Sequence, residues 1–406
     1  MDILYLAREW CFSARVMEIF SSHASEVGYS AEVLRHGFLS MFRSWGRESF
    51  YSLFHSELSI LLSRAPLEAW LDFSVGASED VDRRSILSGF KRRRIYLVLS
   101  STVPSASFQD VLLSLILPFE VLVRPSRNFL GLYLSLIEDL RHVAPSVGER
   151  ITVSASRSDV EVDDLGISRE IRADLERCDL VNVSGCDATV LLYQTVCEWL
   201  GKPVLMHGHR ISVIAIFRGE YGLLTSSDYL SMAWDVSLWD QLGCLSPRIV
   251  YFEGEEEEAD AFSRRLCESL DEVGVLLPEG EVGVDRLSQY HSAICMALYD
   301  GVRVHRGCVN HDYVFVHSAG ENFSPILHAR CLNVYVTRDA LMSSRQVSPY
   351  GQGFCTRVSV SVSVRRMLSC SGFNYFCTFG HLQSPPLDWK QEGVGRVGQY
   401  LRHMVP

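Results

Sequence analysis

The residue best placed for nucleophilic chemistry in this sequence is Cys244, which stands in the stretch LWDQLGCLSPRIVYF. The spacing of apolar residues predicts a helix over 226–241 before it, and the apolar run Arg248–Phe252 predicts a strand after it. Gly243 allows a tight turn or a close approach of the backbone, and Pro247 forces the residue before it into an extended conformation. The thiol therefore lies in a break where it can face a cleft and act as a nucleophile. The alternative is a buried cysteine that packs as a small apolar residue.

Alternating strands and helices are expected to position such a site. Apolar runs predict strands at Ile95–Ser100, Glu120–Val123, Ile151–Ser154, Leu180–Val183 and Pro203–Met206. The segments between them predict helices at 107–117, 129–143, 167–177 and 189–200. Strands joined by helices of this length form right-handed βαβ units and a parallel sheet. Such sheets bind ligands beyond the carboxyl ends of their strands, so the loops there should share one crevice.

The composition describes a globular chain. With 406 residues, of which 47% are hydrophobic, it can bury the cores of two domains. The formal charge of −11 argues against a general nucleic-acid binder. Twelve cysteines are scattered without a zinc-like spacing, which favours reduced thiols and no structural metal. No apolar run is long enough to span a bilayer and no signal-peptide pattern is present, so a cytoplasmic protein is expected.

Residues 1 to about 90 are expected to form helices with aromatic side chains on repeating faces, namely Phe38, Phe42, Trp45, Phe50 and Phe54. Such stripes are typical of packing surfaces rather than of cofactor contacts. The basic run Lys91–Arg94 is interpreted as a solvated flank of the first strand, with a phosphate contact as the alternative. Nearer the other end, the strict alternation of Val358–Val364 (VSVSVSV) predicts a half-exposed strand.

The segment around Cys244 resembles the active-site segment of acyl-CoA reductases of the LuxC type, which belong to the aldehyde dehydrogenase superfamily and carry their nucleophilic cysteine in a DQxxCxSP context. In this chain the context is formed by Asp240, Gln241, Cys244, Ser246 and Pro247. The C-terminal stretch GHLQSPPLDWKQEGVGRVGQYLRHMV resembles the closing pattern G-x-x-Q-x-P-x-x-x-W-x-x-x-G of the same family. The two matches stand in the family's order, and the resemblance covers most of residues 90–406.

The resemblance implies a fold class and a division into domains. The expected fold is α/β and aldehyde-dehydrogenase-like, with two α/β domains built on parallel sheets and an N-terminal helical region. The expected segments are a helical region at 1–90, a Rossmann-like cofactor-binding domain at 91–207, a catalytic domain at 208–380 and a C-terminal tail at 381–406. Members of the superfamily commonly assemble into oligomers, so a homo-oligomer is possible. Trp389 is expected to anchor the tail by packing.

The resemblance also implies a reaction. Cys244, as a thiolate, would attack a long-chain acyl-CoA or an acyl-carrier thioester, and NADPH, or else NADH, would reduce the acyl-cysteine to an aldehyde. The pKa of the thiol should then be lowered by nearby N–H dipoles or a cation, with His207, His209 or Arg210 as candidates. His209 is accordingly assigned a catalytic role, and the backbone N–H of Cys244 is expected to stabilise the oxyanion.

The cofactor residues follow from the same resemblance. VLVRPSR resembles the family's strand-end K-P-S segment, so Arg124 and Ser126 are candidates to contact the adenosine ribose or its phosphate. Ser184 and Gly185 occupy the place where the superfamily has a Gly-Ser or Gly-Gly turn, before a helix whose N–H groups can face a pyrophosphate. No G-x-G-x-x-G motif stands at these strand ends, so the residues alone give only a weak cofactor signal.

The chain also departs from its relatives. Thr102 stands where the superfamily has an asparagine that donates to the oxyanion, and losing one such donor typically costs about 10²- to 10³-fold in turnover. Met206 stands near the place of the general-base glutamate that oxidising relatives use for hydrolysis, which favours reduction. The tail reads Trp389-Lys390-Gln391-Glu392-Gly393 where relatives often have His-His-Asp-Gly, so no role is assigned to these polar residues.

Three functions stay open on the sequence. The first is an NAD(P)H-dependent reductase of fatty acyl thioesters. The second is a protein of the same fold that has lost efficient reduction and acts as a binding or scaffold partner, which the altered turns at Thr102 and Ser184 suggest. The third keeps Cys244 as the nucleophile but passes the acyl group to another acceptor, as a transferase or thioesterase.

Overall fold

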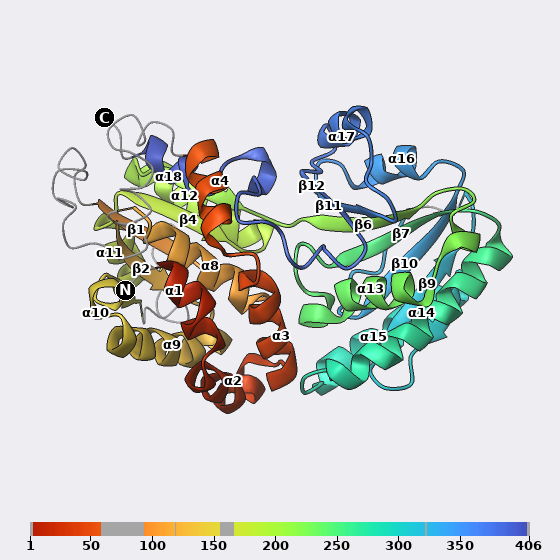
Figure 1. Ribbon diagram of the computed structural model, residues 1–406, viewed down its shortest axis with the longest axis horizontal. Coiled ribbons are helices and arrows are strands. Elements are labelled where there is room, and N and C mark those ends of the chain that lie inside the picture. Colours follow the sequence, from red (N-terminus) through yellow and green to blue (C-terminus); the bar gives the residue numbers. More distant parts are fainter. Residues whose placement is uncertain (1–2, 58–92, 118, 155–165, 321–322, 404–406) are drawn as a thin grey trace.

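The computed structural model describes residues 3–57, 93–117, 119–154, 166–320 and 323–403. These residues form two lobes, each built around one sheet (Figure 1). The first lobe also contains the N-terminal helices, and the C-terminal tail returns to it from the second lobe.

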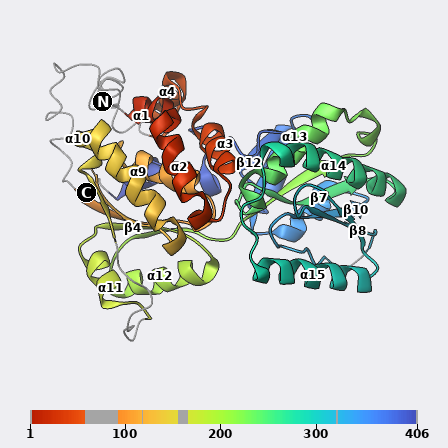
Figure 2. The ribbon, with the colours of Figure 1, turned by 90° about the horizontal axis from the view of Figure 1, so that it is seen from below.

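The first sheet has five parallel strands in the order β3-β2-β1-β4-β5. They are β1 (Arg93–Val98), β2 (Phe119–Arg124), β3 (Ile151–Val153), β4 (Leu180–Ser184) and β5 (Val204–His207). The helices are α8 (Pro104–Ser114), α9 (Leu130–Val143), α10 (Pro145–Gly148), α11 (Arg169–Glu176) and α12 (Asp187–Leu200). Helices α8 and α9 cover one face, while α11 and α12 cover the other (Figure 2). The predicted parallel sheet with helices on both faces is thus confirmed.

Burial on both faces explains why these strands are continuous apolar runs. In β1, Ile95 and Leu97 pack toward α8 and α9, whereas Tyr96 and Val98 pack toward α11 and α12. Because successive side chains of a strand point to opposite faces, the buried part of such a strand is apolar on both sides. The central strands therefore fix the carboxyl-end loops against a rigid core.

The N-terminal helices are α1 (Ile3–Arg8), α2 (Ala14–Val27), α3 (Ala31–Phe42) and α4 (Arg47–Glu57), with a short turn η1 (Trp10–Phe12). They pack on the α8 and α9 side of the first sheet. Trp10 Nε1 donates to Asp139 on α9 at 2.7 Å, and the rings of Phe20 and Phe38 lie 4.5 Å apart. The predicted aromatic stripes are buried and serve packing.

The basic run before β1 is described only in part. Lys91 and Arg92 lie outside the described residues, as do residues 58–90 of the helical region expected at 1–90. Arg93 donates to the carbonyl of His403, and Arg94 pairs with Glu120 at 2.8 Å. The two described arginines thus bind protein groups at the start of the central strand.

The second sheet has seven strands in the order β12-β11-β6-β7-β10-β9-β8. They are β6 (Ile211–Ile216), β7 (Pro247–Glu253), β8 (Arg303–Arg306), β9 (Tyr313–His317), β10 (Cys331–Thr337), β11 (Gly351–Thr356) and β12 (Tyr375–Thr378). All neighbours are parallel except β8, which pairs antiparallel with β9. The main helices are α13 (Ser226–Ser237), α14 (Glu256–Leu276), α15 (Val284–Tyr299), α16 (Ala340–Ser343) and α17 (Val362–Ser369). This sheet is therefore mixed, with an antiparallel edge strand.

Two local predictions are wrong. Val358–Val364 is not a strand, because β11 ends at Thr356 and Ser361 caps α17 by accepting from the N–H of Val364. The four valines do not form one buried face, since Val358 and Val362 are 56% and 72% exposed and only Val360 and Val364 pack partly against the core. The helix expected over 226–241 ends at Ser237, because the chain then turns into left-handed backbone.

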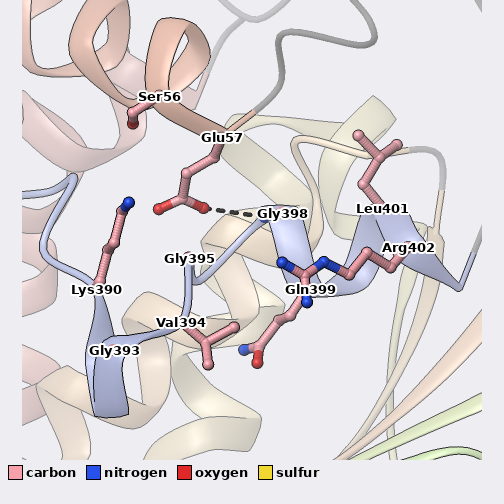
Figure 3. A pocket seen from close by; sticks show the side chains of 10 residues that line it. All are labelled: Ser56, Glu57, Lys390, Gly393, Val394, Gly395, Gly398, Gln399, Leu401 and Arg402. Carbon is pink, nitrogen blue, oxygen red and sulfur yellow. Dashed lines mark hydrogen bonds between the residues drawn. The ribbon is translucent and has the colours of Figure 1, made fainter.

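The C-terminal tail ties the two lobes together. In the second lobe, Asp235 accepts from the N–H groups of Gly380 and Leu382 at 2.7 and 3.0 Å. In the first lobe, Glu57 accepts from the N–H groups of Val397 and Gly398 at 2.7 and 2.9 Å, beside a hollow of about 330 Å³ (Figure 3). The last helix, α18 (Gly398–Arg402), places the Tyr400 hydroxyl 2.9 Å from Asn182 on β4.

Within the described ranges, no helix is both long and apolar enough to cross a membrane.

Candidate active site

A pocket of about 270 Å³ lies where the carboxyl ends of the first sheet face the second lobe. It brings together five of the predicted site residues, namely Cys244, Thr102, His209, Ser184 and Gly185. Two predicted cofactor residues, Arg124 and Ser126, do not line it. The tail closes part of the pocket with Gln383, Pro385, Trp389, Gln391, Glu392 and Arg396.

The backbone leading to Cys244 is strained. Trp239, Asp240 and Gln241 have φ values of 62°, 50° and 59°. Left-handed backbone is uncommon for residues other than glycine, and such strain persists only where the surrounding structure fixes it. Three consecutive residues of this kind make a sharp break between α13 and β7, and the cysteine follows directly after it.

A buried ion cluster holds the middle of this break. Arg330 donates to Asp240 Oδ1 from Nη2 at 2.6 Å and from Nε at 2.9 Å, and Arg330 Nη1 lies 3.1 Å from Asp312. Desolvation raises the pKa of Asp240, and the Arg330 charge opposes this effect. The two charge-assisted hydrogen bonds to Oδ1 therefore compensate the charge of the buried Asp240 carboxylate and fix the direction of the loop.

Packing and hydrogen bonds hold the two sides of the break. The Trp239 ring packs so closely on α3 that a Cβ added at Gly37 would lie 1.8 Å from Trp239 Cζ2. Gln241 Nε2 donates to the Pro247 carbonyl at 2.7 Å. At Gly243 a Cβ would lie 3.1 Å from Val103, so this glycine serves a close approach rather than a positive φ.

Cys244 itself is exposed to the pocket, and its carbonyl accepts from Ser212 Oγ at 2.7 Å. The expectation of a lowered pKa is wrong for this structure. Desolvation and then the charge of Glu392 raise the pKa of Cys244 to about 11, against the opposing effects of its own N–H, Arg210 and Arg396. The thiol is therefore protonated at neutral pH in the absence of ligands.

Glu392 is a site residue that sequence reasoning set aside. Its Oε1 lies 3.4 Å from His207 Nδ1, and its Oε2 lies 3.0 Å from Arg210 Nη2. Burial alone would raise the pKa of Glu392, but the hydrogen bonds from His207 and Arg210 outweigh it and lower the pKa. The pocket thus holds a carboxylate near the thiol, bound by His207 and Arg210, two of the three residues that were candidates to lower the thiol pKa.

The two other predicted catalytic residues lie at the rim. The Thr102 hydroxyl lies 2.9 Å from Ser100 Oγ, and the Thr102 carbonyl accepts from the Tyr29 hydroxyl. The backbone N–H of His209 donates to Asp187 at 2.8 Å, and its exposed imidazole lies 6.5 Å from the Tyr350 ring. Both residues belong to the lining of the pocket that contains Cys244.

The predicted cofactor residues divide between two strand ends. Ser184 ends β4, and the N–H of Gly185 donates to the His207 carbonyl at 3.1 Å just before α12. Arg124 ends β2, which lies on the other side of β1 from β4. Its Nη1 donates to the Tyr193 hydroxyl at 3.2 Å. Arg124 Nε and Ser126 Oγ are buried and have no hydrogen-bond partner within the described part of the chain.

Two further buried side chains were missed by sequence reasoning. Arg396 and Gln109 line the pocket and are only 4% and 2% exposed. Arg396 Nη2 pairs with Asp110 at 2.9 Å, but its Nε and Nη1 and the Gln109 Nε2 have no partner among the residues described. Nothing local marks these residues, because α8 and the tail meet only in the folded chain.

Trp389 has a double role. Its Nε1 donates to Asn374 at 3.1 Å and its ring packs 5.5 Å from Tyr375, as expected for an anchor of the tail. It also forms part of the pocket wall.

Across the described residues, no group of three or more His, Cys, Asp or Glu side chains could hold a metal ion.

Comparison with solved structures identifies the fold. The chain is similar to an NAD-dependent benzaldehyde dehydrogenase from Corynebacterium glutamicum, with a TM-score of 0.63 at 13% identity over 93% of this chain and 80% of that one. It is similar to an NAD-dependent aldehyde dehydrogenase from Sinorhizobium meliloti, with a TM-score of 0.60 at 13% identity over 98% and 78%. It is also similar to a methylmalonate-semialdehyde dehydrogenase from Oceanimonas doudoroffii, with a TM-score of 0.60 at 14% identity over 96% of this chain and 83% of that one. The predicted aldehyde-dehydrogenase-like fold is confirmed.

Comparison with curated proteins gives no match. The model of one protein family, the acyl-CoA reductases of the LuxC type, matches residues 12–394. The match includes the loop of Cys244, both sheets and the tail through Glu392. The chain therefore belongs to the LuxC family of acyl-CoA reductases and is an oxidoreductase by family.

Proposed function

We propose that this protein reduces a fatty acyl thioester to the aldehyde, with a nicotinamide cofactor as the hydride donor and Cys244 as the carrier of the acyl group. The observation that carries the proposal is the single pocket onto which Cys244 opens from the second lobe and Ser184-Gly185 from the first. An acyl group on this thiol would stand beside the strand end at which α/β sheets bind nucleotides. Membership of the LuxC family supplies the acyl thioester as the substrate class.

The residues at the strand ends fit a dinucleotide. Arg124 Nε and Ser126 Oγ are buried donors without a partner among the described residues, and a ribose hydroxyl or a phosphate supplies an acceptor for such groups. Ser184 and Gly185 precede α12, whose N-terminal N–H groups favour an anion. A nicotinamide cofactor, when bound, supplies the hydride. We propose NADPH, with NADH as the alternative, because LuxC-type reductases use NADPH; two of the structural neighbours are named NAD-dependent.

Cys244 takes the acyl group. Its sulfur bonds to the acyl carbon, the thiol proton leaves, and the coenzyme A or carrier thiol departs. Because the pKa of this thiol is about 11 in the free protein, a pocket base has to take the proton as the bond forms. We assign that role to His209, which lines the pocket and carries the side-chain type that most often serves as a general base.

Two donors stabilise the oxygen of the carbonyl as it becomes negative. We assign the backbone N–H of Cys244 and the hydroxyl of Thr102 to this role. Ser100 can donate to Thr102, which leaves the Thr102 proton free for the substrate. Reduction needs no activated water, and the end of β5 offers Met206 rather than a carboxylate for such a purpose.

Intact-protein mass spectrometry tests the proposal. Incubation with tetradecanoyl-CoA should add one acyl group, and subsequent NADPH should remove it with release of the aldehyde. Cys244→Ala should form no adduct, whereas Cys186→Ala, which removes the other thiol lining the pocket, should retain it. An adduct that persists with NADPH would move the function to acyl transfer, and one released as free acid would move it to hydrolysis. Unchanged acylation of the Cys244→Ala variant would falsify the nucleophile assignment.

A further inference from the structure

A second hollow lies on the outer side of the active-site wall. It has a volume of about 790 Å³ and runs between the N-terminal helices, α13 and the start of the tail. Helices α3 and α13 face one another here across the junction of the two lobes (Figures 1 and 2). We call this hollow the outer groove. It is lined by Arg8, Phe12, His36, Leu39, Ser40, Phe42, Arg43, Trp234, Gly380, His381 and Ser384.

The outer groove is basic although the chain is acidic. Its lining contains Arg8, Arg43, His36 and His381 but no aspartate or glutamate, while the whole chain carries a formal charge of −11. Arg8 and Arg43 are exposed, and in the described part of the structure neither forms an ion pair. Two permanently charged guanidinium groups without carboxylate partners attract an anion, and phosphate oxygens match their geometry.

The outer groove borders the pocket of Cys244 at two points of the chain. On α3, Ser40 lines the groove and Met41 lines the pocket; in the tail, Ser384 lines the groove and Pro385 lines the pocket. The outer groove and the pocket therefore share a wall at these two places. Ser40 Oγ donates to the Gln383 carbonyl at 3.3 Å, and the Gln383 side chain in turn donates to Ser246 Oγ at 3.0 Å, two residues after the cysteine.

We propose that the outer groove binds the phosphate groups of the acyl donor, that is, of coenzyme A or of the phosphopantetheine arm of a carrier protein. This inference rests on the proposed function. Arg8 and Arg43 would hold the phosphates, and the pantetheine arm would pass the Ser384–Pro385 border so that the thioester reaches Cys244. Phe12 and Trp234 add apolar surface to the same groove, which suits an adenine ring.

The geometry separates this anion site from the cofactor site. The strand-end loops of the first sheet, including Ser184 and Gly185, open onto the pocket, and none of their residues lines the outer groove. The groove is instead built by the N-terminal helices, α13 and the tail. Donor and cofactor would thus approach Cys244 from different sides, and both could be bound together.

Steady-state kinetics on the full chain test the assignment. The double variant Arg8→Gln/Arg43→Gln should raise KM for tetradecanoyl-CoA about tenfold or more, since charged contacts to phosphate are lost. KM for tetradecanoyl-pantetheine, which lacks phosphates, and KM for NADPH should stay unchanged. The control Arg47→Gln/Arg169→Gln removes two exposed arginines elsewhere and should leave all three values as they are.

Measurements with different acyl donors distinguish the source of the phosphate. A rise in KM for tetradecanoyl-CoA assigns the groove to coenzyme A, whereas a rise only for an acylated carrier protein assigns it to the phosphopantetheine arm. If the double variant had the wild-type KM for every acyl donor, or if its KM rose for NADPH instead, the inference would be overturned. Calorimetric titration with coenzyme A is independent of reduction, and loss of binding in the double variant supports the groove even if no aldehyde forms. Undiminished binding of coenzyme A together with an unchanged KM for the acylated carrier protein overturns the inference.

Discussion

Two charged clusters flank Cys244, and they differ in burial. The cluster of Asp240, Arg330 and Asp312 is buried, with side chains at most 1% exposed. The cluster of Glu392, His207 and Arg210 lies in the pocket, with side chains 11% to 23% exposed. Both pair carboxylates with cations, yet only the second contains groups that a ligand can reach.

The difference in burial indicates that the two clusters have different roles. Breaking a buried ion pair leaves an uncompensated charge in a medium of low dielectric constant, so the first cluster tolerates one arrangement of the loop. It therefore fixes the position of Cys244 through the left-handed residues 239–241. The pocket cluster is less constrained and acts through its electric field, which bears directly on the pKa of the thiol.

The largest expected effect comes from Arg330→Met. This change leaves Asp312 buried without a cation and leaves Asp240 with only Arg286, whose Nη1 lies 3.8 Å from Asp240 Oδ2. It should lower the free energy of unfolding by about 3–5 kcal/mol. Urea unfolding followed by tryptophan fluorescence measures the loss. Acylation of Cys244 should fall as well, because the break that positions the cysteine loses its support.

A surface arginine provides the control for Arg330. Arg303 also pairs with two carboxylates, Glu256 and Asp260, but its side chain is 42% exposed. Arg303→Met should therefore cost only about 0–1 kcal/mol. If both variants lost the same small amount of stability, the buried cluster would not be what fixes the loop before Cys244.

Gly37→Ala should disturb the support of the loop 239–241 without changing any charge. In an exposed helix this substitution usually stabilises, but here the added Cβ would lie 1.8 Å from Trp239 Cζ2. Overpacking of this kind typically costs about 1–3 kcal/mol. The melting temperature and the rate of Cys244 alkylation should both change. Gly46→Ala, where a Cβ would meet nothing within 4 Å, should leave both close to wild type.

The elements that follow from local pattern were predictable from the sequence. The strands predicted at Ile151–Ser154 and Leu180–Val183 agree within one residue with β3 and β4, because a strand buried on both faces leaves a continuous apolar run. The error at Val358–Val364 shows the limit of this reasoning. Alternation predicts a strand only if one face is buried, and at this position a serine cap and exposed valines produce a helix start instead.

The site was predictable only where one segment carries it. The place of Cys244 follows from its flanking elements and from its resemblance to a family segment. Glu392 and His207 are separated by 185 positions in the chain, and no spacing pattern records that contact. The direction of the thiol pKa was mispredicted for the same reason. It depends on desolvation and on the Glu392 charge, which exist only in the assembled pocket.

The smallest effect on stability, but a clear one on reactivity, is expected for Glu392→Gln. The Glu392 charge raises the pKa of Cys244, so its removal should lower that pKa from about 11 and free Arg210 to act on the thiolate. Below the pKa, alkylation follows the thiolate fraction, so each unit by which the pKa falls raises the rate about tenfold at a given pH.

The measurement is the rate of iodoacetamide modification between pH 7 and 11, read by mass spectrometry at Cys244. The profile of Glu392→Gln should shift to lower pH, while its unfolding free energy should stay within about 1 kcal/mol of wild type, since a partly exposed pair contributes little. Glu198→Gln, on the exposed side of α12, is the matched control and should leave the profile in place. A shift to higher pH would mean that Glu392 assists the thiolate, and the pocket cluster would then position the thiol as the buried cluster positions its loop.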